Sequence, residues 1–257
     1  MLAILSPAKD MKVLLQQEKA IKEYTVPEFL NKSAGLIVDL KKLKPFELSE
    51  LMRISDKLAT LNYDRYRNWQ KNHTEINASQ AILSFTGEAY RGLRAWEFDQ
   101  QQLKYSQQVL RILSGLYGVI RPLDLIQEYR LEMGTKHNFR GKKNLYEFWQ
   151  STVTKTIDKA IEESPGDKVL INVASNEYVS SINFKKLRNR VLTTSFYQES
   201  NGEINMVAVF AKRARGMMTR FIIENELEHV EDLKAFDSEG YYYDAKRSES
   251  NKWVFVR

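Results

Sequence analysis

The stretch KVLINVAS, Lys168–Ser175, is a continuous apolar run rich in β-branched residues. Such a run is typical of a buried strand. The segment LAILS, Leu2–Ser6, is read as a second short buried strand. Further along, the runs VLTTSFYQ and INMVAVF flank Asn201-Gly202, which is a strong hairpin signal because a type I′ turn needs two residues that tolerate positive φ. We therefore expect a central sheet with at least one antiparallel hairpin.

Several other segments have the apolar spacing of helices. We predict one helix from Phe46 to Asn62, and another that contains Trp149 and Ile161 and ends at the SPG sequence that follows. The segment Leu103–Tyr129 is interpreted as a helix, a glycine-marked turn and a second helical piece. The C-terminal segment Gly240–Arg257 is read as a hairpin-like pair. No repeat or linker divides the chain, so the expectation is one mixed α/β domain over residues 1–257, with helices around a central sheet.

Composition narrows the class of protein. Of the 257 residues, 43% are hydrophobic and 28% charged, which is ordinary for a globular protein with a full core. The lack of cysteine excludes disulfides, iron–sulfur clusters and cysteine nucleophiles. The N-terminus has no basic flank of a signal peptide and no apolar run could span a bilayer, so a cytoplasmic protein without a membrane partner is expected. The net charge of +6 is compatible with a polyanionic partner.

The clearest charge pattern lies in VFAKRARGMMTRFIIEN, Val209–Asn225. On a helical wheel the apolar residues share one sector, and Gly216 falls in the opposite sector with the cations Lys212, Arg213, Arg215 and Arg220. The helix dipole disfavours cations at this end, no acidic residue balances them before Glu224, and an interior glycine costs about 1 kcal/mol. A phosphate bound there would explain these features. The alternative is an ordinary amphipathic surface helix with a cationic outer face.

A glycine turn is expected within LRILSGLYGVIRPLDL, where Gly115, Leu116 and Gly118 separate two apolar pieces. A helix–hairpin–helix module uses such a turn to present backbone N–H groups to a DNA phosphate, independently of base sequence. Arg111 and Arg121 lie nearby and could add cations. In the usual module the glycines are two residues apart, whereas here they are three apart. The alternative is a helix C-cap glycine followed by a turn.

Candidate catalytic residues stand near the ends of the predicted elements. Lys9 follows the first strand, at the edge of the sheet where α/β proteins collect ligands, and a desolvated lysine can act as a nucleophile or base. It could instead be a surface lysine that pairs with an anion. The carboxylates proposed as acid–base partners are Asp124, Glu132 and Glu177. No histidine spacing suits a metal and no nucleotide-binding fingerprint is found, so neither a metal nor a cofactor is expected.

Seven segments in fixed order resemble the YaaA family of peroxide-stress-resistance proteins. They are ILSPAKD, LMRISDKLATLN, LRILSGLYGVIRPLDLIQEYRLEMG, LYEFW, INVASNEY, AKRARGMMTRFIIEN and FDSEGYYYD. The resemblance runs from Leu2 to about Asp244. It implies a cytosolic bacterial protein that supports survival of hydrogen peroxide through lowered free iron and less DNA damage.

The resemblance also implies a single α/β domain with a helix–hairpin–helix element and a positively charged cleft that binds duplex DNA. On this sequence we place the hairpin at Leu113–Val119. The expected cleft cations are Lys9, Arg121, Lys212, Arg213, Arg215 and Arg220.

Three hypotheses for function remain open at this point. The first is a DNA-binding protein that contacts phosphates of double-stranded or distorted DNA and performs no chemistry. The second is a lyase-like or glycosylase-like enzyme that uses Lys9 and a nearby carboxylate. The third is an enzyme for a phosphorylated metabolite. A pocket in which Lys9 and a carboxylate converge beside the basic helix would favour an enzyme, whereas an open cationic groove would favour binding alone.

Overall fold

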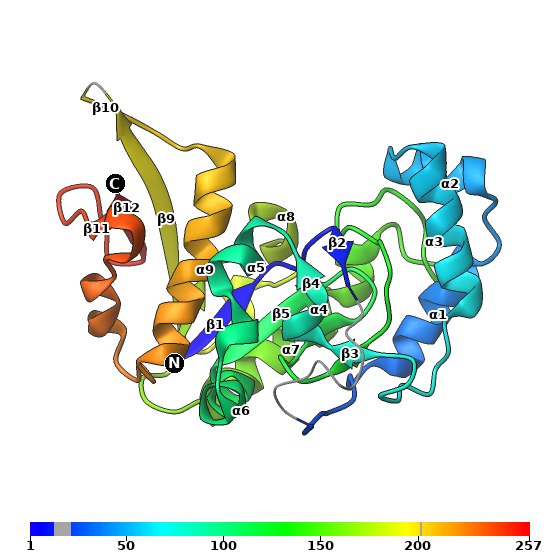
Figure 1. The fold of residues 1–257 in the computed structure, drawn as a ribbon, viewed down its shortest axis with the longest axis horizontal. Helices are drawn as coiled ribbons and strands as arrows, with labels where there is room; N and C mark the ends of the chain where they lie inside the picture. The colour runs from blue at the N-terminus through cyan, green and yellow to red at the C-terminus, as the bar shows by residue number, and fades with distance from the viewer. Residues whose placement is uncertain (13–21, 201) are drawn as a thin grey trace.

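The computed structural model describes residues 1–12, 22–200 and 202–257 (Figure 1). Its centre is an eight-stranded mixed sheet with the strand order β11-β12-β9-β8-β1-β5-β6, to which β10 adds beside β9. Strand β1 (Leu2–Leu5) lies between β8 (Val169–Asn172) and β5 (Leu110–Ser114) and is parallel to both. These three strands are almost wholly buried, as expected for parallel strands covered on both faces.

The sheet continues on both sides of these central strands. Towards one side follow β9 (Arg190–Ser200) and β12 (Lys252–Val256), both parallel to their neighbours, and then the antiparallel β11 (Tyr242–Tyr243). On the other side β6 (Gly118–Ile120) closes the sheet antiparallel to β5. Two small sheets pair β2 (Asp10–Met11) with β4 (Phe85–Thr86), and β3 (Ser79–Gln80) with β7 (Leu125–Ile126).

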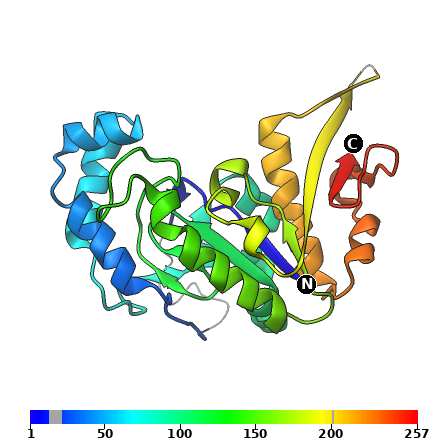
Figure 2. The same cartoon turned by 180° about the vertical axis from the view of Figure 1, so that it is seen from behind.

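Helices cover both faces of the central sheet. Helices α5 (Glu88–Leu93) and α9 (Ala208–Glu224) lie on one face, and α7 (Leu145–Glu163) lies on the other (Figures 1 and 2). A separate group at the end of the molecule away from β9 and β12 contains α1 (Leu30–Leu40), α2 (Pro45–Met52) and α3 (Asp56–Asn68). The remaining α-helices are α4 (Ala81–Ser84), α6 (Gln100–Val109) and α8 (Asn176–Val179). Short 3-10 turns occupy Ala95–Glu97, Phe184–Lys186, Val230–Ala235 and Ser238–Gly240.

Within the described ranges, none of the helices combines the length and apolarity needed to cross a membrane.

Many of the predicted elements are confirmed. The two apolar runs form β1 and β8, and the C-terminal pair forms β11 and β12. The predicted hairpin joins β9 to β10 (Glu203–Asn205), with Gly202 at a φ of 79°, while its other turn residue, Asn201, lies outside the described residues. The predicted helices around Trp149 and over Val209–Asn225 correspond to α7 and α9.

The single helix predicted from Phe46 to Asn62 is instead two helices, α2 and α3. The division falls at Arg53, which adopts a left-handed conformation with φ 52° and ψ 53°. The next helix begins after Ser55, whose Oγ accepts a hydrogen bond from the backbone N–H of Leu58. An N-cap serine therefore starts a new helix inside an apolar pattern that suggested one continuous helix.

The helix–hairpin–helix predicted at Leu113–Val119 is wrong. Only the first piece is helical, as α6, and from Leu110 the chain forms β5, a tight turn and β6, an antiparallel pair. A short apolar run does not distinguish a buried strand from a buried helix by periodicity. Here pairing with β1 selects the strand.

The two glycines of that turn serve backbone packing. A Cβ at Gly115 would lie 2.1 Å from the carbonyl oxygen of Leu131, and one at Gly118 would lie 2.6 Å from the Trp149 ring. The Trp149 indole N–H also donates to the Gly115 carbonyl over 2.9 Å. Because Leu116 and both glycines are buried, this turn presents nothing to an external phosphate.

Gly216 lies at a close contact between two helices. It was predicted on an exposed face, but it is buried where α9 crosses α5, and a Cβ there would lie 1.7 Å from the Ala89 carbonyl oxygen. Across the same crossing, a Cβ at Gly92 would lie 2.2 Å from the Arg213 carbonyl oxygen. The two glycines let the helix backbones touch, which explains a glycine inside a helix without any ligand.

We expect Gly216→Ala to lower the free energy of unfolding by about 2 kcal/mol or more, because backbone atoms cannot yield to the added methyl group. The measurement is urea unfolding followed by circular dichroism. Gly35→Ala is the matched control, since Gly35 lies in α1 and its Cβ would meet only the flexible Arg140 side chain, at 3.3 Å. That control should be neutral or stabilising by up to about 1 kcal/mol. Equal effects of the two substitutions would contradict the account of the α5–α9 contact.

Candidate functional site

A pocket of about 650 Å³ opens at the carboxyl ends of β1 and β8. From β1 the chain runs to β5 on one side, and it later returns to β8 on the other side of β1. The loops that leave β1 and β8 therefore diverge at this edge, which is where open α/β sheets form ligand crevices. The remaining walls come from α5 and α9, which contribute Tyr90, Lys212 and Arg215.

The loops after β1 and β8 are tied together by two serines. The Ser175 backbone N–H donates to Ser6 Oγ over 2.9 Å, and the Ser6 hydroxyl lies 3.2 Å from Ser175 Oγ. The Tyr90 hydroxyl donates to the Ser6 carbonyl over 3.1 Å, which links α5 to the same loop. Burial raises the pKa of Tyr90 and of Tyr178, which also lines the pocket, so both phenols remain protonated near neutral pH. These contacts hold the pocket floor in a fixed shape.

Lys9 lines the pocket and forms an ion pair with Glu132. Its Nζ lies 2.8 Å from Glu132 Oε2, and the other oxygen of Glu132 accepts from Arg130 over 3.1 Å. Gly115 permits this arrangement, because the close approach of Leu131 to its backbone brings the next residue, Glu132, to the sheet edge. The pair places an amine directly beside a carboxylate.

Glu177 is a candidate carboxylate that lines the pocket. It lies in α8, immediately after the β8 loop, and its Oε1 accepts a hydrogen bond from the Gly134 backbone N–H over 3.0 Å. The structure therefore brings Lys9, Glu132 and Glu177 together from three distant parts of the sequence. Lys9 therefore lies beside a carboxylate at a pocket that the basic helix also lines, which is the arrangement that we expect of an enzyme.

The four cations of α9 divide into two kinds. Arg213 pairs with Glu239 at 2.7 Å, and Arg220 pairs with Glu97 at 3.0 Å and with Glu224 at 2.5 Å. These two arginines support the fold, contrary to the expectation that the face lacks acidic partners. Lys212 and Arg215 instead line the pocket. Helix α9 therefore does not present an open cationic face to solvent, because α5 packs against much of it.

Arg121 and Asp124 lie elsewhere. Asp124 is buried and accepts from the backbone and side chain of Arg121, at 2.8 Å and 2.9 Å, and from the Thr25 hydroxyl at 2.6 Å. Both residues follow β6, which is antiparallel to β5, so they stand at the amino end of β5, away from the pocket. The structure does not bring either residue to the site of Lys9.

Sequence reasoning missed the serines and tyrosines of the pocket. Ser6 and Ser175 each follow a predicted strand, and that shared position is the signal that could have identified them. Tyr90 and Tyr178 offered no such signal, because their places depend on how α5 and α8 pack. The burial of Arg215 was likewise invisible in the helical pattern.

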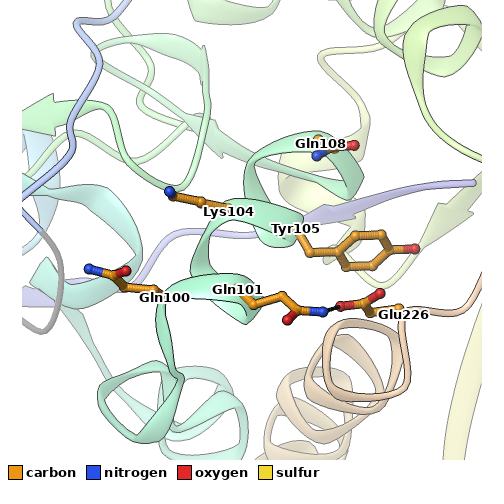
Figure 3. A pocket seen from close by; sticks show the side chains of 6 residues that line it. All are labelled: Gln100, Gln101, Lys104, Tyr105, Gln108 and Glu226. Carbon is orange, nitrogen blue, oxygen red and sulfur yellow. Dashed lines mark hydrogen bonds between the residues drawn. The ribbon is translucent and has the colours of Figure 1, made fainter.

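A second hollow, of about 410 Å³, lies along α6 (Figure 3). It is lined mainly by neutral amide side chains, with Gln101 donating to Glu226 over 2.6 Å. It gathers no set of charged groups comparable with the pocket at β1 and β8. Within the part of the chain that the structure describes, no three histidine or carboxylate side chains are grouped to hold a metal ion.

Comparisons with known proteins agree with the sequence resemblance. A family model described as peroxide stress protein YaaA matches residues 1–247. A UPF0246 protein of Marinomonas sp. (strain MWYL1) is 45% identical over 255 residues, which covers 99% of this chain and 96% of that protein. The chain belongs to the peroxide stress protein YaaA family.

Proposed function

We propose that this member of the family is a cytosolic DNA-binding protein that limits free iron and oxidative DNA damage under hydrogen peroxide stress. The observation that carries the DNA part of the proposal is the hairpin formed by α2, the turn Arg53–Ser55 and α3, called here the α2–α3 hairpin. We propose this hairpin as the DNA-contacting hairpin, in place of the one predicted at Leu113–Val119.

The geometry of the α2–α3 hairpin suits a phosphate contact. The Ile54 backbone N–H donates back to Ser49 over 3.1 Å, and the Ser49 hydroxyl donates to the Ile54 carbonyl over 2.7 Å, so the turn is tightly held. In the first turn of α3 the Leu58 N–H is bound by Ser55, but the N–H groups of Asp56 and Lys57 have no partner within the helix, and such groups are a common site for anions. A helix–hairpin–helix module presents N–H groups to DNA in this way, independently of base sequence.

Exposed side chains around the turn favour a polyanion over a small ligand. Arg53 and Lys57 are exposed on either side of Ser55, and neither forms an ion pair within the described residues. Phe46 and Leu61, on α2 and α3, are exposed by 59% and 43%. Cations with nearby apolar groups on a protruding pair of helices match the surface of a nucleic-acid strand, where phosphates dominate affinity.

We expect the double reversal Arg53→Glu and Lys57→Glu to weaken binding to duplex DNA and to reduce the log–log salt slope by about 1 to 2, because up to two phosphate contacts are lost. The measurement is fluorescence anisotropy of a labelled duplex across a salt series. Lys185→Glu with Lys186→Glu is the control, since it makes the same charge change at exposed lysines far from the hairpin in the sequence. An equal loss in both variants would mean that only net charge matters and would sink the hairpin assignment.

The convergence of Lys9 with carboxylates supports a second candidate function, a lyase that acts on damaged DNA. In such a reaction the Lys9 amine, after Glu132 accepts its proton, attacks the C1′ aldehyde of an abasic deoxyribose. Water leaves and an imine forms. A carboxylate such as Glu177 then removes a C2′ proton, and the 3′ phosphate departs as the C2′–C3′ double bond forms.

Borohydride reduction distinguishes the two candidates. If the lyase operates, reduction in the presence of an abasic duplex should trap a covalent complex that Lys9→Ala abolishes and Lys12→Ala retains. Denaturing electrophoresis detects the complex. Lys12 is a suitable control because it is an exposed lysine close to Lys9 in the sequence. Absence of a complex with the wild-type protein would reject the lyase and leave the binding function in place.

A further inference from the structure

Arg215 is a charged residue for which the described part of the chain supplies no partner. Its side chain is only partly buried, but its Nε is fully buried and makes no hydrogen bond, and its guanidinium forms no ion pair with any described residue. Its neighbours on α9 differ, because Arg213 and Arg220 each have carboxylate partners. Arg65 and Arg130 also have a buried Nε, yet both are paired with a glutamate, at 2.8 Å and 3.1 Å.

This lack of compensation is unfavourable for folding. Withdrawing a charge from water without an opposite charge or hydrogen bonds is unfavourable, so desolvated charges in native proteins are normally paired. Burial is the cause that lowers the pKa of Arg215, with no acidic group to offset it. A group that costs stability and faces a pocket suggests a partner supplied from outside the chain.

The surroundings of Arg215 indicate what that partner is. Lys212, one turn earlier on α9, lines the same pocket and is exposed, so two cations face it from α9. A planar guanidinium matches the oxygens of a phosphate or carboxylate in a bidentate contact. The pocket's own carboxylates do not fill this role: Glu88 pairs with Arg91 at 2.7 Å, Glu177 accepts from Gly134, and Asp10 forms no ion pair with Arg215.

Another residue of the pocket lining disfavours a bare anion as the best ligand. Glu177 would repel a second negative group, but it can accept hydrogen bonds from hydroxyl or amino groups. Tyr90 and Tyr178 add aromatic surface, and the volume of about 650 Å³ is in the usual range for small-molecule sites. A ligand with a phosphate at one end and a polar ring at the other suits both the cations of α9 and Glu177.

We propose that this pocket binds a nucleoside phosphate, with the phosphate on Arg215 and Lys212 and the nucleoside towards Glu177. This inference concerns the pocket of the second candidate function but does not require the lyase chemistry. The ligand can be a free nucleotide or a nucleotide displaced from a DNA strand, because both present the same groups. The close backbone packing at Gly92 and at Gly216 fixes α9 against α5 and so holds Arg215 in place before the ligand arrives.

The test compares Arg215→Gln with Arg213→Gln in the full-length chain. Arg215→Gln removes an uncompensated charge, so it should leave the thermal midpoint unchanged or raise it, whereas Arg213→Gln breaks an ion pair and should lower it. Isothermal calorimetry with deoxyadenosine 5′-monophosphate, deoxyadenosine and inorganic phosphate measures binding. We expect the monophosphate to bind more tightly than either fragment, and Arg215→Gln to weaken it by about tenfold or more while Arg213→Gln retains it.

A second arm distinguishes the source of the nucleotide. If the ligand is a nucleotide of a DNA strand, the wild-type protein should prefer a duplex with an unpaired, bulged nucleotide over an intact duplex, and Arg215→Gln should remove that preference alone. Binding to the intact duplex tests the α2–α3 hairpin and not the pocket. A loss of that binding would therefore contradict the proposed function without contradicting this inference. The proposal is overturned if neither the monophosphate nor the bulge gains affinity through Arg215, or if Arg215→Gln destabilises the protein as much as Arg213→Gln.

Discussion

The placement of β1 between β5 and β8 is the constraint on which the rest of the structure depends. Four buried residues, Leu2–Leu5, pair in parallel on both sides, and this pairing makes the loops after β1 and β8 neighbours although about 170 residues separate them in sequence. The hydrogen bonds between Ser6 and Ser175 follow from that pairing. So does the position of Lys9, which emerges at the edge of the sheet where the pocket opens.

The second constraint is the absence of side chains at two helix positions. Gly92 and Gly216 allow α5 and α9 to meet at backbone distance, and the pocket takes one wall from each helix. A glycine in a helix costs about 1 kcal/mol, which this packing offsets by bringing the two helices together. Arg215 is held at the same crossing. Its guanidinium has no ion-pair partner in the described part of the chain, and under the proposal above some folding stability is given up for binding, a trade-off common at functional sites.

The sequence predicted strands and helices well where a single pattern applied, and failed where tertiary contacts decided. The runs that form β1 and β8 are apolar throughout, and α7 keeps helical spacing along its whole length. Leu110–Ile120 is also apolar, but only the pairing with β1 makes it two strands. For the site, Lys9, Glu132 and Glu177 were identified from their positions at element ends. By contrast, Glu239 and Glu97, which pair with Arg213 and Arg220, lie in short 3-10 turns that no helical wheel could place beside α9.

Our central proposal is that a nucleic acid contacts both the α2–α3 hairpin and the pocket at the ends of β1 and β8. Hydrogen–deuterium exchange of the full chain, with and without a duplex that contains an abasic site, tests it most directly. The account predicts slower exchange at Arg53–Lys57 and in the loops that contain Lys9 and Ser175. Protection confined to other surfaces, such as the exposed side of α7 or the Phe184–Lys186 turn, would contradict it.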